Sequence, residues 1–341
     1  METRKLQEVG GGTYTVSIPK EWATARGLEA GTPVNLYSHR DGSIVVRSRE
    51  KDSDGLSTMR VEVDGSRTQV ERALEAAQAV GFERVTLVAT EPFDDETCRA
   101  VRSLVRRFVG AELVDERDGT LVVRNLLDAS DVSVRQSVVQ LQYIALSIHE
   151  QAIGSFLEAD ADAYERLRER ETEVERLCGI VVRHFGRALV SLEEVDRVGA
   201  SRSELFEYYE TASRLRRVAR NGVTIARVGR HLTAPVPGAV ADELETVANT
   251  VRGVAEGTAN AVLEGRETER VHEMLDTCTE TRTDLDALEE ALVDDRRTLP
   301  SGPTADVVAV ARCLDALRRT LDHGRAIGDV ALQSAMRSER L

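Results

Sequence analysis

The chain has few cysteines and no long apolar run. Its four cysteines stand singly, with neither a CxxC pair nor a histidine at metal-ligand spacing: Cys98, Cys178, Cys278 and Cys313. We therefore expect reduced, mostly buried thiols and no cysteine-based zinc site. No signal-like apolar stretch opens the sequence, and no run approaches the roughly 18 apolar residues of a membrane span. These absences predict a cytoplasmic protein that does not insert into a membrane.

Lysine is also nearly absent. It occurs only at Lys5, Lys20 and Lys51, so arginine supplies 42 of the 45 basic side chains in a chain of net charge −14. An acidic, lysine-poor composition is similar to that of proteins from halophilic organisms. Strong salt screens long-range repulsion, so the net charge does not exclude a nucleic-acid partner. Residues 1–50 carry 7 basic and 6 acidic side chains and the remainder 38 and 53, so only the N-terminus is not strongly acidic.

The patterns typical of catalytic and nucleotide-binding sites are missing. None of the six histidines stands with a serine, cysteine or carboxylate that would specify a nucleophile or a base. We therefore expect that the protein is not an enzyme. Gly10 to Gly12 do not form a dinucleotide fingerprint, because no strand and helix of suitable size surround them.

Residues 1–50 are predicted to form a compact, strand-rich domain. The stretch "TYTVSIPKEWATARGL" from Thr13 begins as a strand, meets a proline and becomes one short helix that ends near Gly27. Two more strands follow, and Asp41-Gly42 suits the tight turn between them. About 50 such residues cannot bury enough surface alone, so we expect an obligate homodimer. Residues 51–57 read as a linker.

Residues 58–127 alternate between strand and helix periodicity in the order βαβαββ. Ser66 is the expected N-cap of the first helix, and Asp118-Gly119 the expected hairpin turn. This order predicts a small connector module with helices on one or both faces of a sheet.

The rest of the chain is helical and shows an internal repeat. Pro235 and Pro237 separate residues 131–234 from residues 238–341. The segment from Arg216 aligns with that from Arg325 at an offset of 109 residues, and the segment from Glu173 aligns with that from Asp284 at an offset of 111. We expect two tandem three-helix bundles. The predicted fold class is therefore a multidomain α+β protein.

"VSIPKEWATARGLEAGTPVNLY" resembles the core of the SpoVT/AbrB swapped-hairpin family, whose members dimerise by interleaving strands and bind DNA. Tyr14 and Thr15 stand where the family usually has glycine then arginine. The resemblance implies promoter DNA as a partner. It implies the following DNA-binding residues: Arg4, Lys5, Thr15, Lys20 and Arg26. The alternative is that this domain only dimerises the protein.

The helical repeat resembles the PhoU family of phosphate uptake regulators, built from two three-helix bundles. "RAIGDVALQSA" from Arg325 matches a motif that often ends each bundle, and "RRVARNGVTIA" from Arg216 matches it with Arg220 at the aspartate position. An AbrB-like domain ahead of PhoU-like bundles resembles archaeal phosphate uptake regulators. The two resemblances together imply a transcriptional regulator of phosphate uptake. An adaptor for a phosphate transporter or its sensor kinase and a metal-binding bundle are the alternatives.

The PhoU resemblance also implies iron or zinc at acidic motifs, in which carboxylates four residues apart share a helix face. The candidate ligands are Glu171, Glu175, Asp286 and Asp329. In the second repeat, Glu171 and Glu175 align with Arg282 and Asp286. The third helix adds Arg220 to the first cluster and Asp329 to the second, so each cluster contains an arginine. A second register keeps two acids, Glu280 and Asp284. Ordinary glutamate–arginine ion pairs are the competing hypothesis.

Six arginines crowd one predicted helix: Arg214, Arg216, Arg217, Arg220, Arg227 and Arg230. A solvated face paired with neighbouring acids is the ordinary interpretation. The alternative is a docking stripe for an acidic partner or a bound anion.

Overall fold

The computed structural model describes residues 3–38, 42–47, 55–117, 119–127, 132–265, 268–293 and 304–338. The chain divides into two compact units, Met1–Gly55 and Leu56–Leu341, which we call the N-terminal and C-terminal units. No helix in the described ranges is both long and apolar enough to cross a membrane.

The N-terminal unit consists of two antiparallel hairpins and a short helix. Its elements are β1 (Gln7–Val9), β2 (Thr13–Thr15), α1 (Lys20–Ala25), β3 (Asn35–Ser38) and β4 (Ile44–Arg47). β1 pairs with β2, and β3 pairs with β4 in the hairpin that the sequence predicts. Gly42 has φ +81°, which fits the expected turn, whereas Asp41 lies outside the described residues. Proline at position 19 precedes α1, where its fixed φ suits the helix start.

No apolar side chain in the described part of the N-terminal unit is buried. Seven of its large apolar residues are exposed by 40% or more: Leu6, Val9, Tyr14, Val16, Ile18, Leu36 and Ile44. The others in the described part, such as Trp22 and Val45, are half-buried, so one copy of the unit encloses no buried core and leaves apolar side chains in solvent.

The C-terminal unit begins with an α/β module, residues 56–127. Its elements are β5 (Thr58–Glu62), α2 (Arg67–Val80), β6 (Arg84–Val88), α3 (Asp95–Arg107), β7 (Ala111–Arg117) and β8 (Thr120–Asn125). The predicted order βαβαββ is confirmed. The strands lie in the order β5-β6-β8-β7, with β5 parallel to β6 and the other pairs antiparallel.

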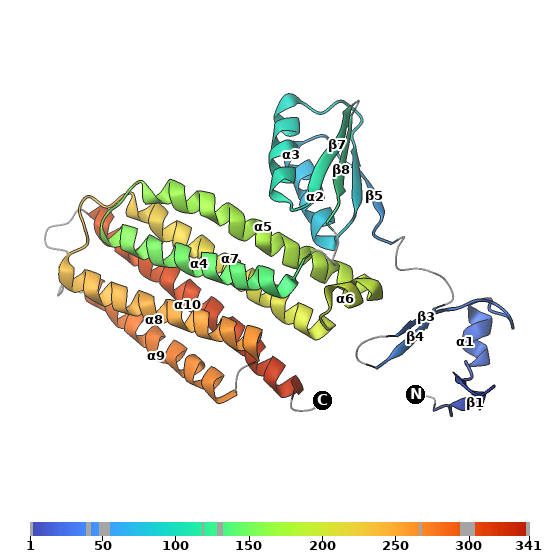
Figure 1. Ribbon diagram of the computed structural model, residues 1–341. Helices are drawn as coiled ribbons and strands as arrows, with labels where there is room; N and C mark the ends of the chain where they lie inside the picture. The colour runs from blue at the N-terminus through green and yellow to red at the C-terminus, as the bar shows by residue number, and fades with distance from the viewer. Residues whose placement is uncertain are drawn as a thin grey trace. The chain divides into compact units, whose positions relative to one another are not determined.

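Both helices of the α/β module cover the same face of the sheet (Figure 1). Alternate residues of the central strands, Leu87 on β6 and Leu121 on β8, are fully buried against α2 and α3. Arg84 and Arg124 pair across β6 and β8 and are exposed on the other face. Because side chains alternate between the two faces of a strand, one face of the sheet is apolar and is covered by both helices. The module therefore has two layers.

A serine cap and two glycines with positive φ mark the ends of elements in the module. Ser66 is the N-cap of α2 and accepts a hydrogen bond from the Gln69 amide, as predicted. Gly81 ends α2 with φ +100°, a conformation that favours glycine. Gly119 has φ +71° in the β7–β8 turn, whereas Asp118 lies outside the described residues.

Residues 132–338 form two helical bundles. Bundle 1 contains α4 (Val134–Leu157), α5 (Ala163–Val190), α6 (Leu192–Val198) and α7 (Arg202–Gly229); bundle 2 contains α8 (Gly238–Glu264), α9 (Thr268–Val293) and α10 (Thr304–Ser338). Each bundle has the three expected long helices. The short α6 was not predicted, although Ser191 caps it and Gly199 ends it with φ +73°.

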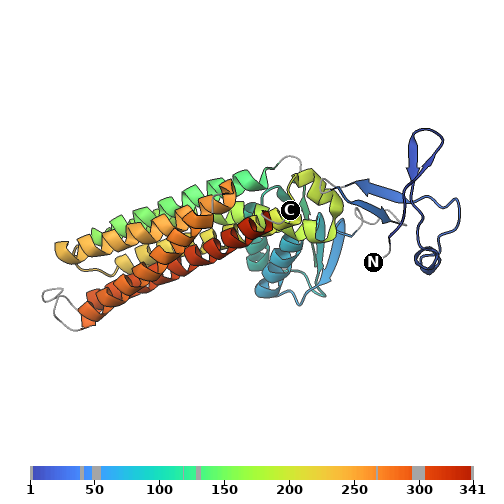
Figure 2. The same ribbon diagram turned by 90° about the horizontal axis from the view of Figure 1, so that it is seen from below.

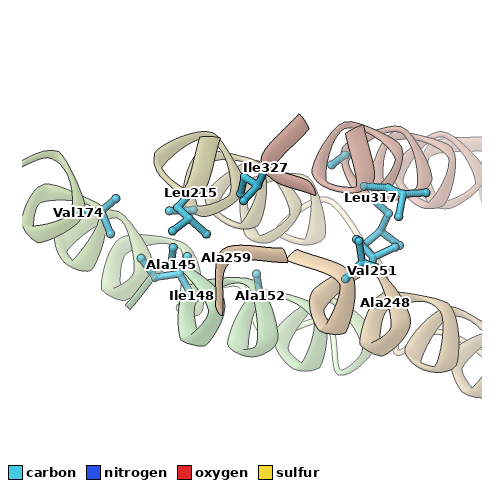
Figure 3. Close-up of a cluster of buried hydrophobic side chains, with 14 of the residues drawn as sticks. Ala145, Ile148, Ala152, Val174, Leu215, Ala248, Val251, Ala259, Leu317 and Ile327 are labelled. Carbon is cyan, nitrogen blue, oxygen red and sulfur yellow. The ribbon is translucent and has the colours of Figure 1, made fainter. Parts of the chain in front are cut away.

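The two bundles share one continuous hydrophobic core. Their helices run alongside one another in both views (Figure 1 and Figure 2). Figure 3 shows Leu215 of α7 over Ile148 of α4 in bundle 1, and Leu317 of α10 over Val251 of α8 in bundle 2. Between the bundles, the Gln142 amide donates to Asn260 at 2.8 Å and the Asn221 amide donates to Thr320 at 3.2 Å. The repeat therefore folds as one body rather than as two separate domains.

The internal repeat is present, but in a register seven residues shorter than the sequence alignment indicates. In bundle 1 α7 approaches α4 at Gly222, where an added Cβ would lie 3.1 Å from the His149 Cα. In bundle 2 α10 begins 102 residues after α7, and at that offset Gly222 corresponds to Gly324, where a Cβ would lie 3.3 Å from the Ala255 Cα of α8.

The middle helices show the same shift. α5 begins at Ala163 and α9 at Thr268, 105 residues later, and at about this offset the buried Leu167, Val174 and Val181 correspond to the buried Val271, Cys278 and Leu285. An apolar stripe repeats about every seven residues, so a slip of one heptad preserves the stripe and cannot be detected from it.

Candidate functional sites

All five predicted DNA-binding residues are exposed on the N-terminal unit. Arg4 and Lys5 lie three and two residues before the start of β1, and Thr15 is the last residue of β2. Lys20 is the first residue of α1, and Arg26 is its C-cap. Four cationic side chains are thus available to solvent around a small hairpin and helix, which suits contacts to phosphates.

Two of these five residues also make contacts within the unit. The Thr15 hydroxyl donates to the Gln7 carbonyl at 3.3 Å, across the β1–β2 hairpin. The Arg26 guanidinium lies 4.6 Å from the centroid of the Trp22 ring on α1. The cation–π contact holds Arg26 beside α1 without neutralising its charge.

The acidic pair in bundle 1 is already compensated by arginine. Arg220 on α7 donates to Glu175 at 2.6 Å and to Glu171 at 3.4 Å, and Arg216 donates to Glu175 at 3.2 Å. The competing hypothesis of glutamate–arginine ion pairs describes these contacts. Guanidinium groups beside both carboxylates repel a divalent cation, so this set of donors does not fit a metal site.

The candidate ligands of bundle 2 lie apart from that pair. Asp286 on α9 pairs with Arg318 at 3.0 Å, and Asp329 is exposed on α10. In the corrected register Glu171 and Glu175 correspond to Leu275 and Thr279, so bundle 2 does not repeat the acidic pair. The described ranges contain no group of three or more metal-binding side chains. Metal binding stays a prediction.

The arginines of α7 mostly pair with nearby acids. Arg214 contacts Glu210 at 3.1 Å, and the two arginines at 216 and 220 hold the acidic pair. Arg230 lies 3.9 Å from Glu165, and its guanidinium is 5.1 Å from the Tyr164 ring centroid. These contacts favour the ordinary interpretation of this helix face.

A buried polar cluster joins the α/β module to bundle 1, and the sequence did not reveal it. Arg183 on α5 is 1% exposed and donates to the Phe82 carbonyl at 3.0 Å. Arg187, one turn later, donates to the Gly81 carbonyl at 2.8 Å and to Glu194 at 2.9 Å. Two arginines of α5 therefore satisfy the carbonyls that follow the end of α2.

Glu194 on α6 completes this cluster. Its carboxylate is 2% exposed and lies 2.6 Å from the His184 Nδ1. Burial alone would raise the pKa of Glu194, but hydrogen bonds from His184 and Arg187 hold it below its usual value. One signal of this cluster is present in the sequence: the polar residues Arg183, His184 and Arg187 lie close to the apolar stripe of α5.

Two comparisons connect these features to known proteins. Residues 7–54 match the family described as "Antidote-toxin recognition MazE, bacterial antitoxin". The N-terminal unit is thus a MazE/AbrB-like domain, as the sequence resemblance implies. No curated protein sequence matches the chain.

The structure is similar to a crystal structure of PhoU from Pseudomonas aeruginosa, with a TM-score of 0.50 and 15% sequence identity. The match covers 60% of this chain and 95% of that one. PhoU from Streptococcus pneumoniae, titled a phosphate transport system regulatory protein, aligns with a TM-score of 0.49 and 12% identity over 59% of this chain and 92% of that one. The chain therefore combines a MazE/AbrB-like N-terminal domain with helical bundles of the PhoU fold.

Proposed function

We propose that this chain is a DNA-binding transcriptional regulator of phosphate uptake and phosphate homeostasis. The observation that carries the proposal is the MazE match over residues 7–54, on a unit whose five candidate contact residues are all exposed. The PhoU fold of the bundles and the PhoU-like motif from Arg325 support phosphate supply as the regulated process.

Two copies of the N-terminal unit would pair in this function. One copy leaves apolar side chains exposed, and a second copy that covers them would also double the number of cationic side chains facing DNA. Leu36→Asp is expected to abolish the dimer in sedimentation equilibrium. Tyr143→Asp, on α4 with a 75% exposed side chain, is the matched control and should leave the mass unchanged. Equal dimer populations in both variants would refute pairing through this unit.

DNA binding is tested by titrating full-length protein against promoter DNA of phosphate-transporter genes from the same genome. The variant Lys5→Ala, Lys20→Ala, Arg26→Ala removes three exposed charges per chain. If two chains act together, six phosphate contacts are lost, and the slope of log K against log salt should flatten by up to about 5.

The control replaces three exposed arginines on the open face of the α/β sheet, Arg60→Ala, Arg84→Ala and Arg124→Ala. It changes net charge equally and should keep both the affinity and the salt slope. Identical loss in the two triple variants would mean that general charge, not this face, attracts DNA. Absence of binding at any salt concentration would refute the regulator proposal.

One observation favours a second candidate. The bundles cover 95% of a complete PhoU chain, so they could act without the N-terminal unit. The corresponding function is an adaptor that inhibits a phosphate transporter or its sensor kinase. Capture of such a partner from cells by the full chain and by a chain lacking residues 1–50, together with absent DNA binding, would establish the adaptor instead.

A further inference from the structure

A cavity of about 370 Å³ lies where the α/β module packs on bundle 1, inside the C-terminal unit. Residues of α2 and α3 form one side, and residues of α5 and α7 form the other. The volume falls in the range of small-molecule pockets, roughly 300–1,000 Å³. Of the candidate metal ligands only Glu175 lines this cavity, and none of the proposed DNA-binding residues lines it.

The cavity has more positive than negative side chains along its wall. It is lined by four arginines and two glutamates: Arg107, Arg176, Arg216, Arg220, Glu75 and Glu175. Glu175 is already paired with two of these arginines. Arg107 and Arg176 are exposed and pair with no carboxylate in the described part of the chain. Two uncompensated guanidinium groups therefore stand at the cavity.

Arg216 and Arg220 lie on the α7 side of the cavity, where both pair with Glu175. Planar guanidinium groups pair with the oxygens of phosphate in a bidentate manner, and arginine is therefore common at phosphate sites.

Apart from Gln78, the remaining side chains of the wall are apolar. Phe108, Leu127 and Ile180 line it, and the buried Cys178 thiol adds a neutral surface because burial raises its pKa to about 11. Inorganic phosphate alone would leave this wall without a contact. A ligand with a ring or another apolar part would use it, since aromatic side chains such as Phe108 pack on flat rings.

We propose that this cavity binds a phosphate-bearing organic anion of nucleotide size. Its phosphate would meet the arginines and its organic part the apolar wall. Because the wall comes from both the α/β module and bundle 1, the bound ligand would stabilise their contact. This proposal does not depend on DNA binding.

The test uses purified full-length protein, calorimetry and a thermal-shift assay. The probes are AMP, ADP, ATP and GMP, with inorganic phosphate and adenosine as partial ligands. The expected result is binding of at least one nucleotide at one site per chain, at least about tenfold tighter than inorganic phosphate or adenosine. No binding of any nucleotide, or equal binding of inorganic phosphate, would overturn the proposal.

A filled cavity provides the site-specific variant. Gly179 on α5 lines the cavity, and an added Cβ there would meet no atom within 4 Å. Gly179→Leu should therefore fold and should abolish nucleotide binding. Gly253→Leu on α8, where a Cβ also meets nothing within 4 Å, is the matched control and should bind normally. Unchanged affinity in Gly179→Leu would overturn the assignment.

Charge is tested separately. Arg107→Gln with Arg176→Gln should weaken nucleotide binding by about tenfold or more, because each loses a charge-assisted contact to phosphate. Arg106→Gln changes the neighbouring exposed arginine of α3, which does not line the cavity, and should have no effect. Equal affinities in the two variants would overturn the phosphate assignment. The Lys5, Lys20 and Arg26 triple variant should keep nucleotide binding, so failure of one proposal is distinguishable from failure of the other.

Discussion

Replacing Gly186 by alanine should weaken the contact between the α/β module and bundle 1. Gly186 lies on α5, against the carbonyl oxygens of Ala79 and Val80 at the end of α2. An added Cβ would overlap the Ala79 oxygen and lie 3.2 Å from the Val80 oxygen. Both atoms belong to the backbone, so the module must shift as a whole.

The magnitude follows from two opposing effects. Overpacking of this kind costs about 1–3 kcal/mol, and the shift would also strain the hydrogen bonds of Arg183 and Arg187 to the Phe82 and Gly81 carbonyls. Alanine in place of glycine stabilises a helix interior by about 1 kcal/mol. Strain in these hydrogen bonds of about 1 kcal/mol would offset the gain in helix propensity. We therefore expect a net loss of about 1–3 kcal/mol in the free energy of unfolding.

The assay is urea unfolding followed by far-ultraviolet circular dichroism. Tryptophan fluorescence is unsuitable, because the single tryptophan is Trp22 in the N-terminal unit. Gly253→Ala, where a Cβ meets nothing within 4 Å, is the matched control and should be stabilised by about 1 kcal/mol. Stabilisation of Gly186→Ala by the same amount would refute the close approach of α5 to α2.

Three further changes test other parts of the C-terminal unit. Glu194→Ala should cost about 3–5 kcal/mol, because it leaves the Arg187 guanidinium and the buried His184 ring without their carboxylate partner; thermal unfolding measures it, and a loss below 1 kcal/mol would contradict the buried cluster. Ser201→Ala removes the capping box of α7 and should cost about 1 kcal/mol in urea unfolding. Burial lowers the pKa of His149 from its ordinary 6.5 to about 4, so only the unfolded chain gains this proton between those values. Stability should therefore fall as pH drops from 6.5 towards 4, by up to about 1.4 kcal/mol per unit from this histidine. Burial of His323 adds to the slope in the same direction. A His149→Leu variant with an unchanged slope in pH-dependent unfolding would refute the assignment to this residue.

Apart from the short α6, local patterns in the sequence were sufficient to predict the elements and their order. The turn glycines, the Ser66 cap and the alternation of periods predict the strands and helices of the N-terminal unit and the α/β module, because each signal acts within a few residues. The apolar stripes likewise predict the long helices of both bundles.

The repeat register could not be read in the same way. A stripe with a period of about seven residues matches itself after a slip of one heptad, whereas the corresponding long helices of the two bundles begin 102–105 residues apart in the structure. The transfer of Glu175 to Asp286 depended on the register of the sequence alignment.

By itself the sequence determined the order of the elements, the faces they bury and the two related bundles, because these depend on short-range periodicity and on turn chemistry. Tertiary structure alone decided which charges meet. Arg220 reaches Glu175 from 45 residues away, and Arg183 reaches Phe82 from 101 residues away. The cavity between the α/β module and bundle 1 likewise exists only once two separately predicted elements pack together. Such contacts depend on how helices cross and where a glycine permits close approach, and no local pattern in the chain specifies either.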